Sequence, residues 1–327
     1  MGDILRCSGF QDIPPGLRGG VIAIGNFDGV HRGHQAVLAR ALQIAEVENA
    51  PPVVLTFEPH PRRVFRPDVP LFRLTPAPMK ARVLGAMGFA AVVEQPFTRE
   101  FSSLPAVRFV AEVLSAGLGA AHVVTGYDFH YGKGRGGTPE TLEAGGQAYG
   151  FGVTVVDAFS DEGGEVVSSS RIRALLDAGE VAEAAGLLGY RYTVEAEVIG
   201  GRKLGRTLGF PTANMALPDE TGLRHGIYAV RFRRADGTLH DGVASFGIRP
   251  TVEDKGVPLL ETFLFDFHGD LYGETCAVSF FGFLRGEEKF DGLDALVAQI
   301  RRDEAEARAL LAGVRPLSGL DLAIAFP

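Results

Sequence analysis

The sequence has few cysteines, no excess of basic residues and no long apolar run. Its two cysteines, Cys7 and Cys276, are too few for a disulfide framework or a zinc ribbon, so we expect ordinary reduced thiols. A formal net charge of -8 at pH 7 argues against a broad nucleic-acid-binding face, although a phosphate site needs few basic residues. Neither a membrane-spanning run nor the basic-then-apolar start of a signal peptide is present. We expect a cytoplasmic protein that binds neither nucleic acid nor a membrane.

Length and composition predict two globular domains. A chain of 327 residues is long for a single hydrophobic core, and 46% hydrophobic and 22% charged residues are ordinary proportions for a globular protein. In the first half, short apolar segments alternate with helix-like segments, which predicts an α/β fold with a parallel sheet and helices on both faces. The expected strands begin at Val21, Pro52, Ala90, Ala121 and Val153. One further helix is expected over residues 170–189.

The second half has a different pattern. From residue 190 onwards, partly alternating apolar segments follow one another closely and are joined by hairpin signals such as "ADG", not by helices. This arrangement predicts a small antiparallel β-barrel, closed by a single helix over residues 293–313. We place the N-terminal domain at residues 1–187 and the C-terminal domain at residues 188–327.

The segment "GNFDGVHRGH", residues 25–34, is the principal motif of the first half. It follows an apolar strand and enters a helix expected to begin near residues 33–34, and ligands of open parallel sheets bind beyond the carboxyl ends of the strands. A helix N-terminus at that position attracts anions. The glycines that let the backbone turn and approach a bulky ligand are Gly25, Gly29 and Gly33.

The two histidines of this motif, His31 and His34, allow three interpretations. They could hold a metal ion, but zinc needs three or four protein ligands, and the further candidates are Asp28 and the distant His60. They could simply cap and pack the helix. The interpretation that we favour is that each donates a hydrogen bond to one phosphate chain.

Three other segments contain side chains suited to the same site. In "VSSSRIR", Ser169 and Ser170 precede a helix and Arg173 lies one turn into it, so they form either a triphosphate clamp or a plain serine cap with exposed arginines. The segment "TGYDFHYGKGRGG", residues 125–137, suits either a loop that covers a flat aromatic ligand or a surface loop. In "TFEPHPR", the prolines fix a loop in which His60 either enters the cleft or braces the loop.

The principal motif of the second half is "GRKLGRTLGFPTAN", residues 201–214. It lacks the Gly-Lys-Ser/Thr ending of a Walker loop, yet backbone amides around Gly205 and Gly209 can wrap phosphates. We expect a following turn to present Thr212 and Asn214 on one side, where a hydroxyl and a carboxamide oxygen suit a Mg²⁺ ion that bridges ATP phosphates. The alternative is a turn with an asparagine cap.

Glu261 is the candidate base of the second half. It follows the apolar pair Leu259 and Leu260 in an expected strand, an unusual place for a charge that serves no site. A carboxylate beside a substrate hydroxyl can take its proton during phosphoryl transfer, whereas Mg²⁺ and positioning supply the larger share of catalysis. The alternative is an ion pair with an arginine on a neighbouring strand.

In chain order, "GNFDGVHRGH", "TFEPHPR", "GYDFHYGKGRGG" and "SSSRIR" resemble the adenylyltransferase half of the bacterial bifunctional riboflavin kinase/FAD synthetases, which belongs to the nucleotidylyl transferase superfamily. The segments "GRKLGRTLGFPTAN", "ASFGIRPT", "ETFLFDFHGDLYG" and residues 283–308 resemble the riboflavin kinase domain of the same family. The resemblance covers residues 19–312 and implies a Rossmann-like domain followed by a β-barrel domain. It also implies two reactions: riboflavin and ATP give FMN and ADP, and FMN and ATP give FAD and pyrophosphate.

For the first half, the resemblance implies catalytic roles for His31, His34 and Arg173, which would stabilise the ATP phosphates while the FMN phosphate attacks. The residues that it implies at ATP are Gly25, Phe27, Asp28, Gly29, Gly33, Ser169 and Ser170. Those that it implies at the flavin are Asp128, Phe129, Tyr131 and His60. The chain departs from the family pattern at Ser170, where threonine is frequent, and at Tyr131, where phenylalanine is common.

For the second half, the resemblance implies that Thr212 and Asn214 coordinate Mg²⁺ with ATP. It implies phosphate contacts at Gly205 and Gly209, and a Glu261 that activates the terminal ribityl hydroxyl of riboflavin. The implied partners are small molecules, namely riboflavin, FMN and ATP, with Mg²⁺ as cofactor, and we expect a monomer or weak homo-oligomer. One alternative is a monofunctional kinase or adenylyltransferase in which the other site has lost its activity, but the motifs are intact in both halves. The other alternative is a flavin- or nucleotide-binding regulator without turnover, which would not need Glu261 or the two histidines.

Overall fold

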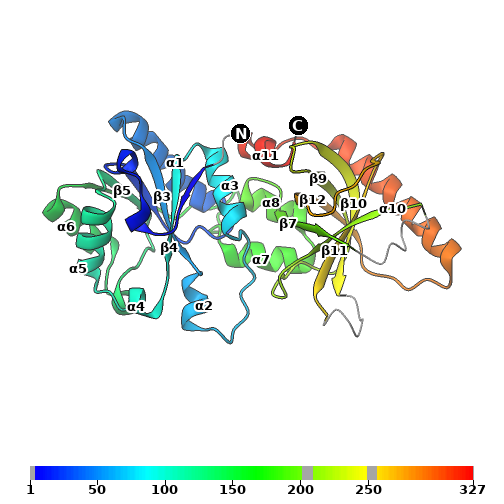
Figure 1. The fold of residues 1–327 in the computed structure, drawn as a ribbon, viewed down its shortest axis with the longest axis horizontal. Coiled ribbons are helices and arrows are strands. Elements are labelled where there is room, and N and C mark those ends of the chain that lie inside the picture. Colours follow the sequence, from blue (N-terminus) through cyan, green and yellow to red (C-terminus); the bar gives the residue numbers. More distant parts are fainter. Residues whose placement is uncertain (1–3, 201–208, 249–255, 327) are drawn as a thin grey trace. The chain divides into compact units, whose positions relative to one another are not determined.

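The computed structural model describes residues 4–200, 209–248 and 256–326, and the chain forms two compact units (Figure 1). The first unit contains the residues up to 71 together with 75–168, and the second contains 72–74 and the chain from 169 onwards. Each unit has its own sheet and hydrophobic core. These structural units do not by themselves show which residues serve which function. The functional domains at residues 1–187 and 188–327 therefore remain predictions.

The first unit is built on a six-stranded parallel sheet. The strand order is β1-β4-β3-β2-β5-β6, and every neighbouring pair is parallel. The strands are β1 (Leu5–Cys7), β2 (Val21–Ile24), β3 (Pro52–Glu58), β4 (Ala91–Pro96), β5 (His122–Gly126) and β6 (Gly152–Val156). The prediction of a parallel α/β sheet is confirmed; the short edge strand β1 was not predicted. From β2 the chain adds β3 and β4 on one side of the sheet and then β5 and β6 on the other. Ligands bind where the direction of the connections changes, so the carboxyl ends of β2 and β5 are the expected ligand position.

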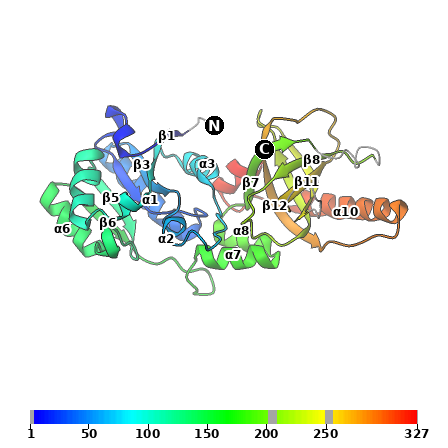
Figure 2. The ribbon, with the colours of Figure 1, turned by 60° about the horizontal axis from the view of Figure 1, so that its bottom comes forward.

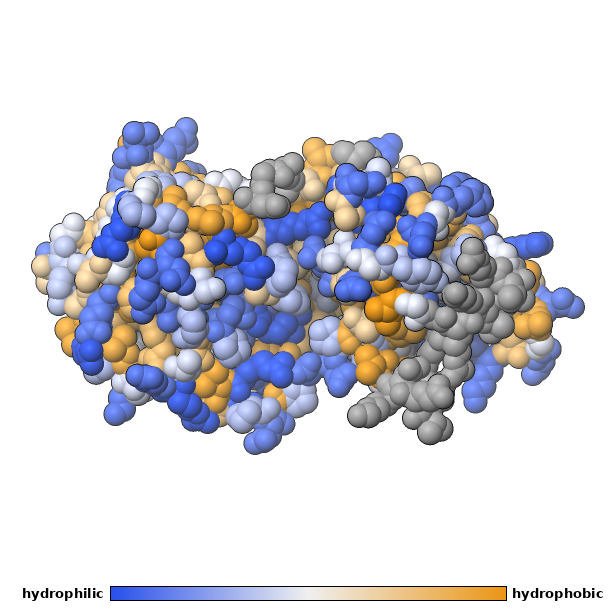
Figure 3. Space-filling view, in the orientation of Figure 1, coloured by the Kyte–Doolittle hydropathy of each residue, from blue (hydrophilic) through white to orange (hydrophobic). Residues whose placement is uncertain are grey.

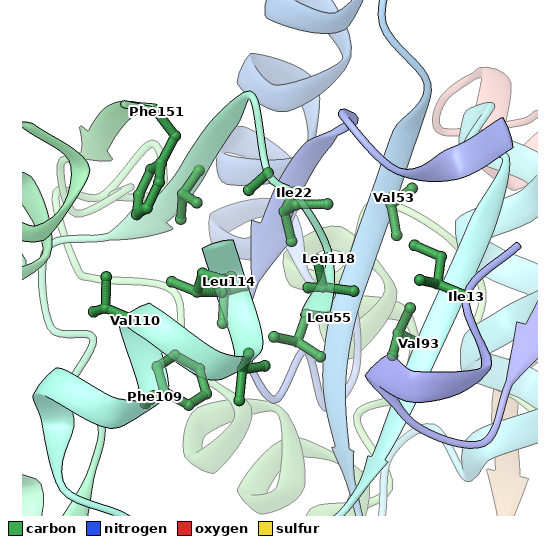
Figure 4. Close-up of a cluster of buried hydrophobic side chains, with 14 of the residues drawn as sticks. Ile13, Ile22, Val53, Leu55, Val93, Phe109, Val110, Leu114, Leu118 and Phe151 are labelled. Atoms are coloured by element: carbon green, nitrogen blue, oxygen red, sulfur yellow. The ribbon is translucent and has the colours of Figure 1, made fainter. Parts of the chain in front are cut away.

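Helices pack against this sheet and close its core. The longer ones are α1 (Arg32–Glu48), α3 (Ala77–Met87), α6 (Pro139–Tyr149), and α5 (Ala106–Arg108) with its π-helical continuation η3 (Phe109–Gly117). Figure 4 shows Ile22, Leu55, Leu114 and Leu118 within one buried cluster, which joins the sheet to η3. Because successive strand residues face opposite sides, Val21 on β2 faces away from this cluster, and α1 packs against β2 and β5.

Several short elements complete the first unit. The short helices α2 (Pro61–Phe65) and α4 (Arg99–Ser102) follow β3 and β4, and 3-10 turns connect other elements. Those turns are η1 (Phe10–Asp12), η2 (Pro15–Leu17) and η4 (Lys133–Arg135). On the face that Figure 3 presents, hydrophilic and hydrophobic residues are interspersed over the surface of each unit. Among the described residues, none of the helices has the length and apolar character that a membrane crossing needs.

The second unit is built on a closed antiparallel barrel with the order β10-β11-β8-β7-β12-β9 (Figure 2). The strands are β7 (Thr193–Ile199), β8 (Thr212–Ala216), β9 (Gly226–Arg233), β10 (Leu239–Ile248), β11 (Pro258–Leu264) and β12 (Thr275–Arg285). The long helix α10 (Leu293–Gly313) packs against β9, β10 and β12. The prediction of a small barrel with a closing helix is confirmed.

Three local predictions for the second unit are wrong. The single helix expected over 170–189 is two helices, α7 (Ser169–Ala178) and α8 (Val181–Leu188), because Gly179 takes a left-handed φ of +84° that ends α7. The turn expected at Thr212 is strand β8, which pairs with β11. A second C-terminal helix, α11 (Gly319–Ala325), follows α10.

Both cysteines are free and buried, as the expectation of ordinary thiols requires. Burial raises the pKa of the Cys7 thiol and raises that of Cys276 to about 11. Because the thiolate is the reactive form, neither side chain is a nucleophile at neutral pH.

A buried ion pair anchors α11 to the start of the barrel. The fully buried carboxylate of Asp321 accepts hydrogen bonds from the Arg191 backbone N (2.7 Å), from Arg191 Nη1 (3.0 Å) and from the Leu317 backbone N (2.9 Å). The Arg191 guanidinium also lies 5.0 Å from the centre of the Phe281 ring. Residues 313–327, which lie outside the family resemblance, therefore include a structural anchor.

Removal of the Asp321 carboxylate should strongly destabilise the second unit. Asp321→Ala leaves the Arg191 charge buried without its partner, and we expect a loss of about 3–5 kcal/mol in the free energy of unfolding, measured by native-state hydrogen exchange of the barrel strands. The matched control is Asp266→Ala, which removes a carboxylate that is 81% exposed and paired with Arg308. That change should cost far less stability because solvent screens the exposed pair, and equal losses for the two variants would contradict the assignment.

Candidate active sites

The loop between β2 and α1 has an unusual backbone. Phe27 and Val30 take positive φ angles of 46° and 38°, and Gly29 takes 91°. Positive φ is rare for a non-glycine residue, and for a β-branched one such as Val30 it is an outlier that the surroundings must stabilise. The Phe27 ring folds back over Gly25, where an added Cβ would lie 2.9 Å from ring atoms. Glycine at position 25 therefore makes room for the buried Phe27 ring.

Thr75 holds this loop through two reciprocal hydrogen bonds. The Asp28 carboxylate accepts from the Thr75 backbone N at 3.1 Å, and the Gly29 backbone N donates to Thr75 Oγ1 at 2.8 Å. Asp28 is 3% exposed, so its carboxylate has a structural position within the loop. The predicted contact of Asp28 and Gly29 with ATP stays a prediction.

The loop ends by placing His31 at the N-cap of α1, which begins at Arg32, slightly earlier than predicted. His31 Nδ1 accepts from the His34 backbone N at 3.3 Å, so a neutral His31 carries its proton on Nε2. The His31 and His34 rings stack with centres 3.6 Å apart, and the edge-to-face contact of Phe27 with His34 fixes the second ring. The motif therefore delivers two parallel imidazoles at a helix N-terminus.

The electrostatics of the site keep the second imidazole uncharged. The pKa of His34 lies well below its ordinary value, first because of burial and then because of the nearby His31 and Lys80. Among the described residues, His34 Nδ1 is buried without a hydrogen-bond partner. His34 is thus suited to donate a hydrogen bond to an anion rather than to supply a full charge. No group of three or more His, Cys, Asp or Glu side chains with metal-binding geometry occurs in the part of the chain that the structure describes.

The predicted flavin residues follow β3 and β5 but differ in their surroundings. His60 caps α2, where its Nδ1 accepts from the Arg62 backbone N at 3.1 Å. Asp128 is exposed, and Phe129 stacks on Tyr131 with ring centres 5.6 Å apart. Tyr131 lies in the hydrophobic core, with its hydroxyl 3.2 Å from Thr141 Oγ1 and a pKa raised by burial.

The predicted triphosphate residues lie in the first turns of α7, within the second unit. Ser169 and Ser170 are the first two helical residues, and Arg173 Nε donates to the Phe72 carbonyl at 2.7 Å. In the first unit, the Val167 carbonyl lies 3.4 Å from the position of a Cβ on Gly33, at the start of α1. The chain thus passes the head of α1 two residues before Ser169.

The second candidate site lies on one face of neighbouring barrel strands. Glu261 on β11 pairs directly with Asn214 on β8, so their Cβ atoms are about 5 Å apart on the same face. Thr212, two residues before Asn214, shares that face. Asn214 Nδ2 donates to the Thr212 carbonyl at 3.4 Å, while Asn214 Oδ1 is buried without a hydrogen-bond partner among the described residues. The structure therefore brings these predicted residues together across the register of two strands.

The glycines of the second motif are only partly described. Gly209 has a left-handed φ of +85°, and an added Cβ there would meet no atom within 4 Å. Gly205 lies outside the described residues.

Sequence reasoning missed three residues beside these sites. Thr75 accepts a hydrogen bond from the loop between β2 and α1, and the buried Lys80 on α3 donates to the same loop at Asn26. Ser245 on β10 is the register partner of Glu261 on the side opposite Asn214. Of these, Lys80 alone has a local signal, as a cation between the apolar residues of a helix. The other two are brought to their sites by long-range pairing.

Comparisons with known proteins match each half of the chain to a family. Residues 14–171 match the FAD synthetase family, and residues 188–311 match the riboflavin kinase family. The bifunctional riboflavin kinase/FMN adenylyltransferase of Listeria monocytogenes is 42% identical over 301 residues, which cover 89% of this chain and 92% of that protein. This chain belongs to the bifunctional riboflavin kinase/FMN adenylyltransferase family. The relative of the same name from Pseudomonas fluorescens is 41% identical and covers 93% of this chain and 97% of its own length.

A solved structure agrees with the fold. The crystal structure of a macrolide-efflux protein from Streptococcus pneumoniae superimposes with a TM-score of 0.81 at 32% identity, covering 94% of this chain and 99% of that one. The match extends through both units, which supports the order of a parallel-sheet unit followed by a barrel.

The lowered pKa of His34 predicts a pH-dependent stability. As pH falls below about 6.5, the unfolded chain binds a proton at His34 that the folded chain does not, so the first unit loses stability, by up to about 1.4 kcal/mol per pH unit. His34→Gln should remove this part of the slope between pH 7 and pH 5, measured by urea unfolding with hydrogen exchange in β2 and β5. Identical slopes for the two proteins would contradict the buried, neutral imidazole.

Proposed function

We propose that this chain makes FAD in two steps at two separate sites. Residues 188–327 transfer the terminal phosphate of ATP to riboflavin and give FMN, and residues 1–187 transfer the adenylyl group of a second ATP to FMN and give FAD and pyrophosphate. The observation that carries this proposal is that each unit holds its own set of reactive side chains. These are the stacked imidazoles at the head of α1 and the cross-strand pair of Glu261 with Asn214.

In the kinase step, Glu261 accepts the proton of the terminal ribityl hydroxyl as that oxygen attacks the γ-phosphorus, and ADP leaves as the bond from the γ-phosphorus to the bridging oxygen breaks. Thr212 and Asn214 suit Mg²⁺, because they supply hard oxygen ligands and the buried Asn214 Oδ1 has no other partner in the described residues. Bound there with ATP, the cation neutralises charge on the phosphates. Backbone amides around Gly205 and Gly209 hold the same phosphates.

In the adenylylation step, a phosphate oxygen of FMN attacks the α-phosphorus of ATP and pyrophosphate leaves. His31 donates from Nε2 and His34 donates beside it, so both stabilise negative charge as it develops. Arg173 neutralises charge on the leaving pyrophosphate, and Ser169 and Ser170 bind its oxygens. The aligned peptide dipoles at the head of α1 add to this stabilisation.

The remaining assignments concern binding. The ATP-binding residues of the first site are Gly25, Phe27, Asp28, Gly29 and Gly33, and its flavin-binding residues are Asp128, Phe129, Tyr131 and His60. We assign Mg²⁺ as the divalent cation of both reactions. The enzyme acts on small molecules in the cytoplasm, as a monomer or weak homo-oligomer.

Glu261→Gln tests the kinase site. The amide keeps the shape of the side chain but cannot accept the proton, so formation of FMN from riboflavin should fall by about 10²–10⁴-fold while conversion of FMN to FAD is unchanged. Separation of the flavins by chromatography measures both rates. The matched control is Glu197→Gln, an exposed carboxylate on β7, which should leave both rates at the wild-type value. An equal loss of both reactions in Glu261→Gln would refute the division of labour.

His31→Ala tests the adenylylation site in the opposite sense. Loss of the Nε2 donor should lower conversion of FMN to FAD by about 10²–10³-fold, the usual effect of a lost transition-state donor, and leave FMN formation intact. The same chromatographic assay gives both rates. A variant that still makes FAD at the wild-type rate would exclude His31 from the reaction.

A further inference from the structure

The first unit contains a buried lysine that donates three hydrogen bonds to the framework of the adenylylation site. Lys80 on α3 is 1% exposed. Its Nζ donates to the Asn26 carbonyl at 2.9 Å, to Thr56 Oγ1 at 3.0 Å and to Glu58 Oε1 at 3.0 Å. An ammonium is almost never fully buried unless it is paired, and here it is both paired and fully hydrogen-bonded. Such a group holds its neighbours in defined positions.

The three acceptors belong to two different segments. Asn26 lies in the loop between β2 and α1, whereas Thr56 and Glu58 lie at the carboxyl end of β3. Thr56 Oγ1 donates to the same Asn26 carbonyl at 3.2 Å. Lys80 and Thr56 therefore tie the start of the loop to the neighbouring strand.

The loop needs such a restraint because its backbone is strained. Phe27 and Val30, within four residues after Asn26, take positive φ angles at a cost of about 1–3 kcal/mol each. A strained conformation persists only where its surroundings over-determine it. His31 directly follows Val30. It caps α1 and its ring stacks on that of His34, so its position sets the positions of both imidazoles.

We propose that Lys80 is a positioning residue of the adenylylation site, which fixes the loop from Asn26 to His31 and so holds both imidazoles against the phosphate chain. The proposal rests on the function proposed above for His31 and His34. Lys80 itself is buried and does not touch the substrate.

The charge of Lys80 gives the proposal a second readout. Among the described residues, the charged groups that lower the pKa of His34 are His31 at the N-terminus of α1 and Lys80 on α3. The same part of the unit also contains the carboxylates of Glu58 on β3 and Asp28 in the loop. The Lys80 charge disfavours a second positive charge and thereby contributes to the lowered pKa of His34. Removal of that charge should raise the pKa of His34, so the imidazole should take up its proton at a higher pH.

Lys80→Met, which keeps the length of the side chain and removes the ammonium, is the principal test. A displaced catalytic group commonly costs about 10²-fold, and we expect that loss in kcat for FAD formation from FMN. FMN formation from riboflavin in the same protein should stay at the wild-type rate and reports that the second unit is folded, while hydrogen exchange in β2 and β5 reports whether the first unit is folded. The matched control is Arg40→Met, which removes an exposed cation from α1 and should leave both rates unchanged. If the wild-type protein makes no FAD, the proposed function fails; if Lys80→Met makes FAD at the wild-type rate, the positioning role fails.

A double variant separates positioning from simple stability. Lys80→Met with Glu58→Gln leaves no unpaired charge, so the first unit should regain stability toward urea while FAD formation stays low and the pKa of His34, followed by NMR of the imidazole, stays raised. Recovery of FAD formation together with stability would show a merely structural role and overturn the proposal.

Thr56→Val covers the case in which the Lys80 variants do not fold. It removes one of the two donors to the Asn26 carbonyl and keeps the ammonium, so FAD formation should fall by roughly tenfold, as for the loss of about 1.4 kcal/mol, with no change in the pKa of His34. A wild-type rate in this variant would contradict the restraint on the loop.

Discussion

The adenylylation site depends on one constraint, namely that the chain must leave β2 through left-handed backbone conformations before it can enter α1. This path is what brings His31 to the cap and lets His34 stack on it one turn later. The strain is held by hydrogen bonds from outside the loop, to Thr75 on one side and to Lys80 on the other. The parallel sheet contributes by placing the loop at the point where the strand order reverses.

The two sites are built by different means, which explains why they were not equally predictable. The spacing of His31 and His34 is local, so a helix start after an apolar strand was enough to predict that both histidines could donate to one phosphate chain. The pair of Glu261 and Asn214 depends on the register of β11 with β8, and the sequence places them far apart. Their chemistry was predictable from residue type and family resemblance, but the strand conformation at Thr212 was not, because long-range pairing overrides the turn propensity of the preceding Gly-Phe-Pro.

Most of the fold was predictable from apolar periodicity. The five strands expected in the first unit are present as β2 to β6, and the barrel and α10 are present in the second unit. The break between α7 and α8 was missed because apolar spacing continues across Gly179, and α11 was missed because a short helix has little periodicity of its own. The supports of the first site escaped prediction for another reason. A buried cation such as Lys80 gains its meaning only from acceptors on other segments.

Closure of the barrel has a consequence for the kinase site. In an open sheet a strand can slide by a residue at its free edge, but each strand of a ring is held on both sides, so the alignment of Glu261 with Asn214 is fixed by all the other pairings at once. A deletion of one residue inside β11 before Glu261 would turn its carboxylate toward the barrel interior, where Leu260 and Thr262 now point. Changes in chain length are therefore compatible with this site in the connections between strands, and not within the strands that form it.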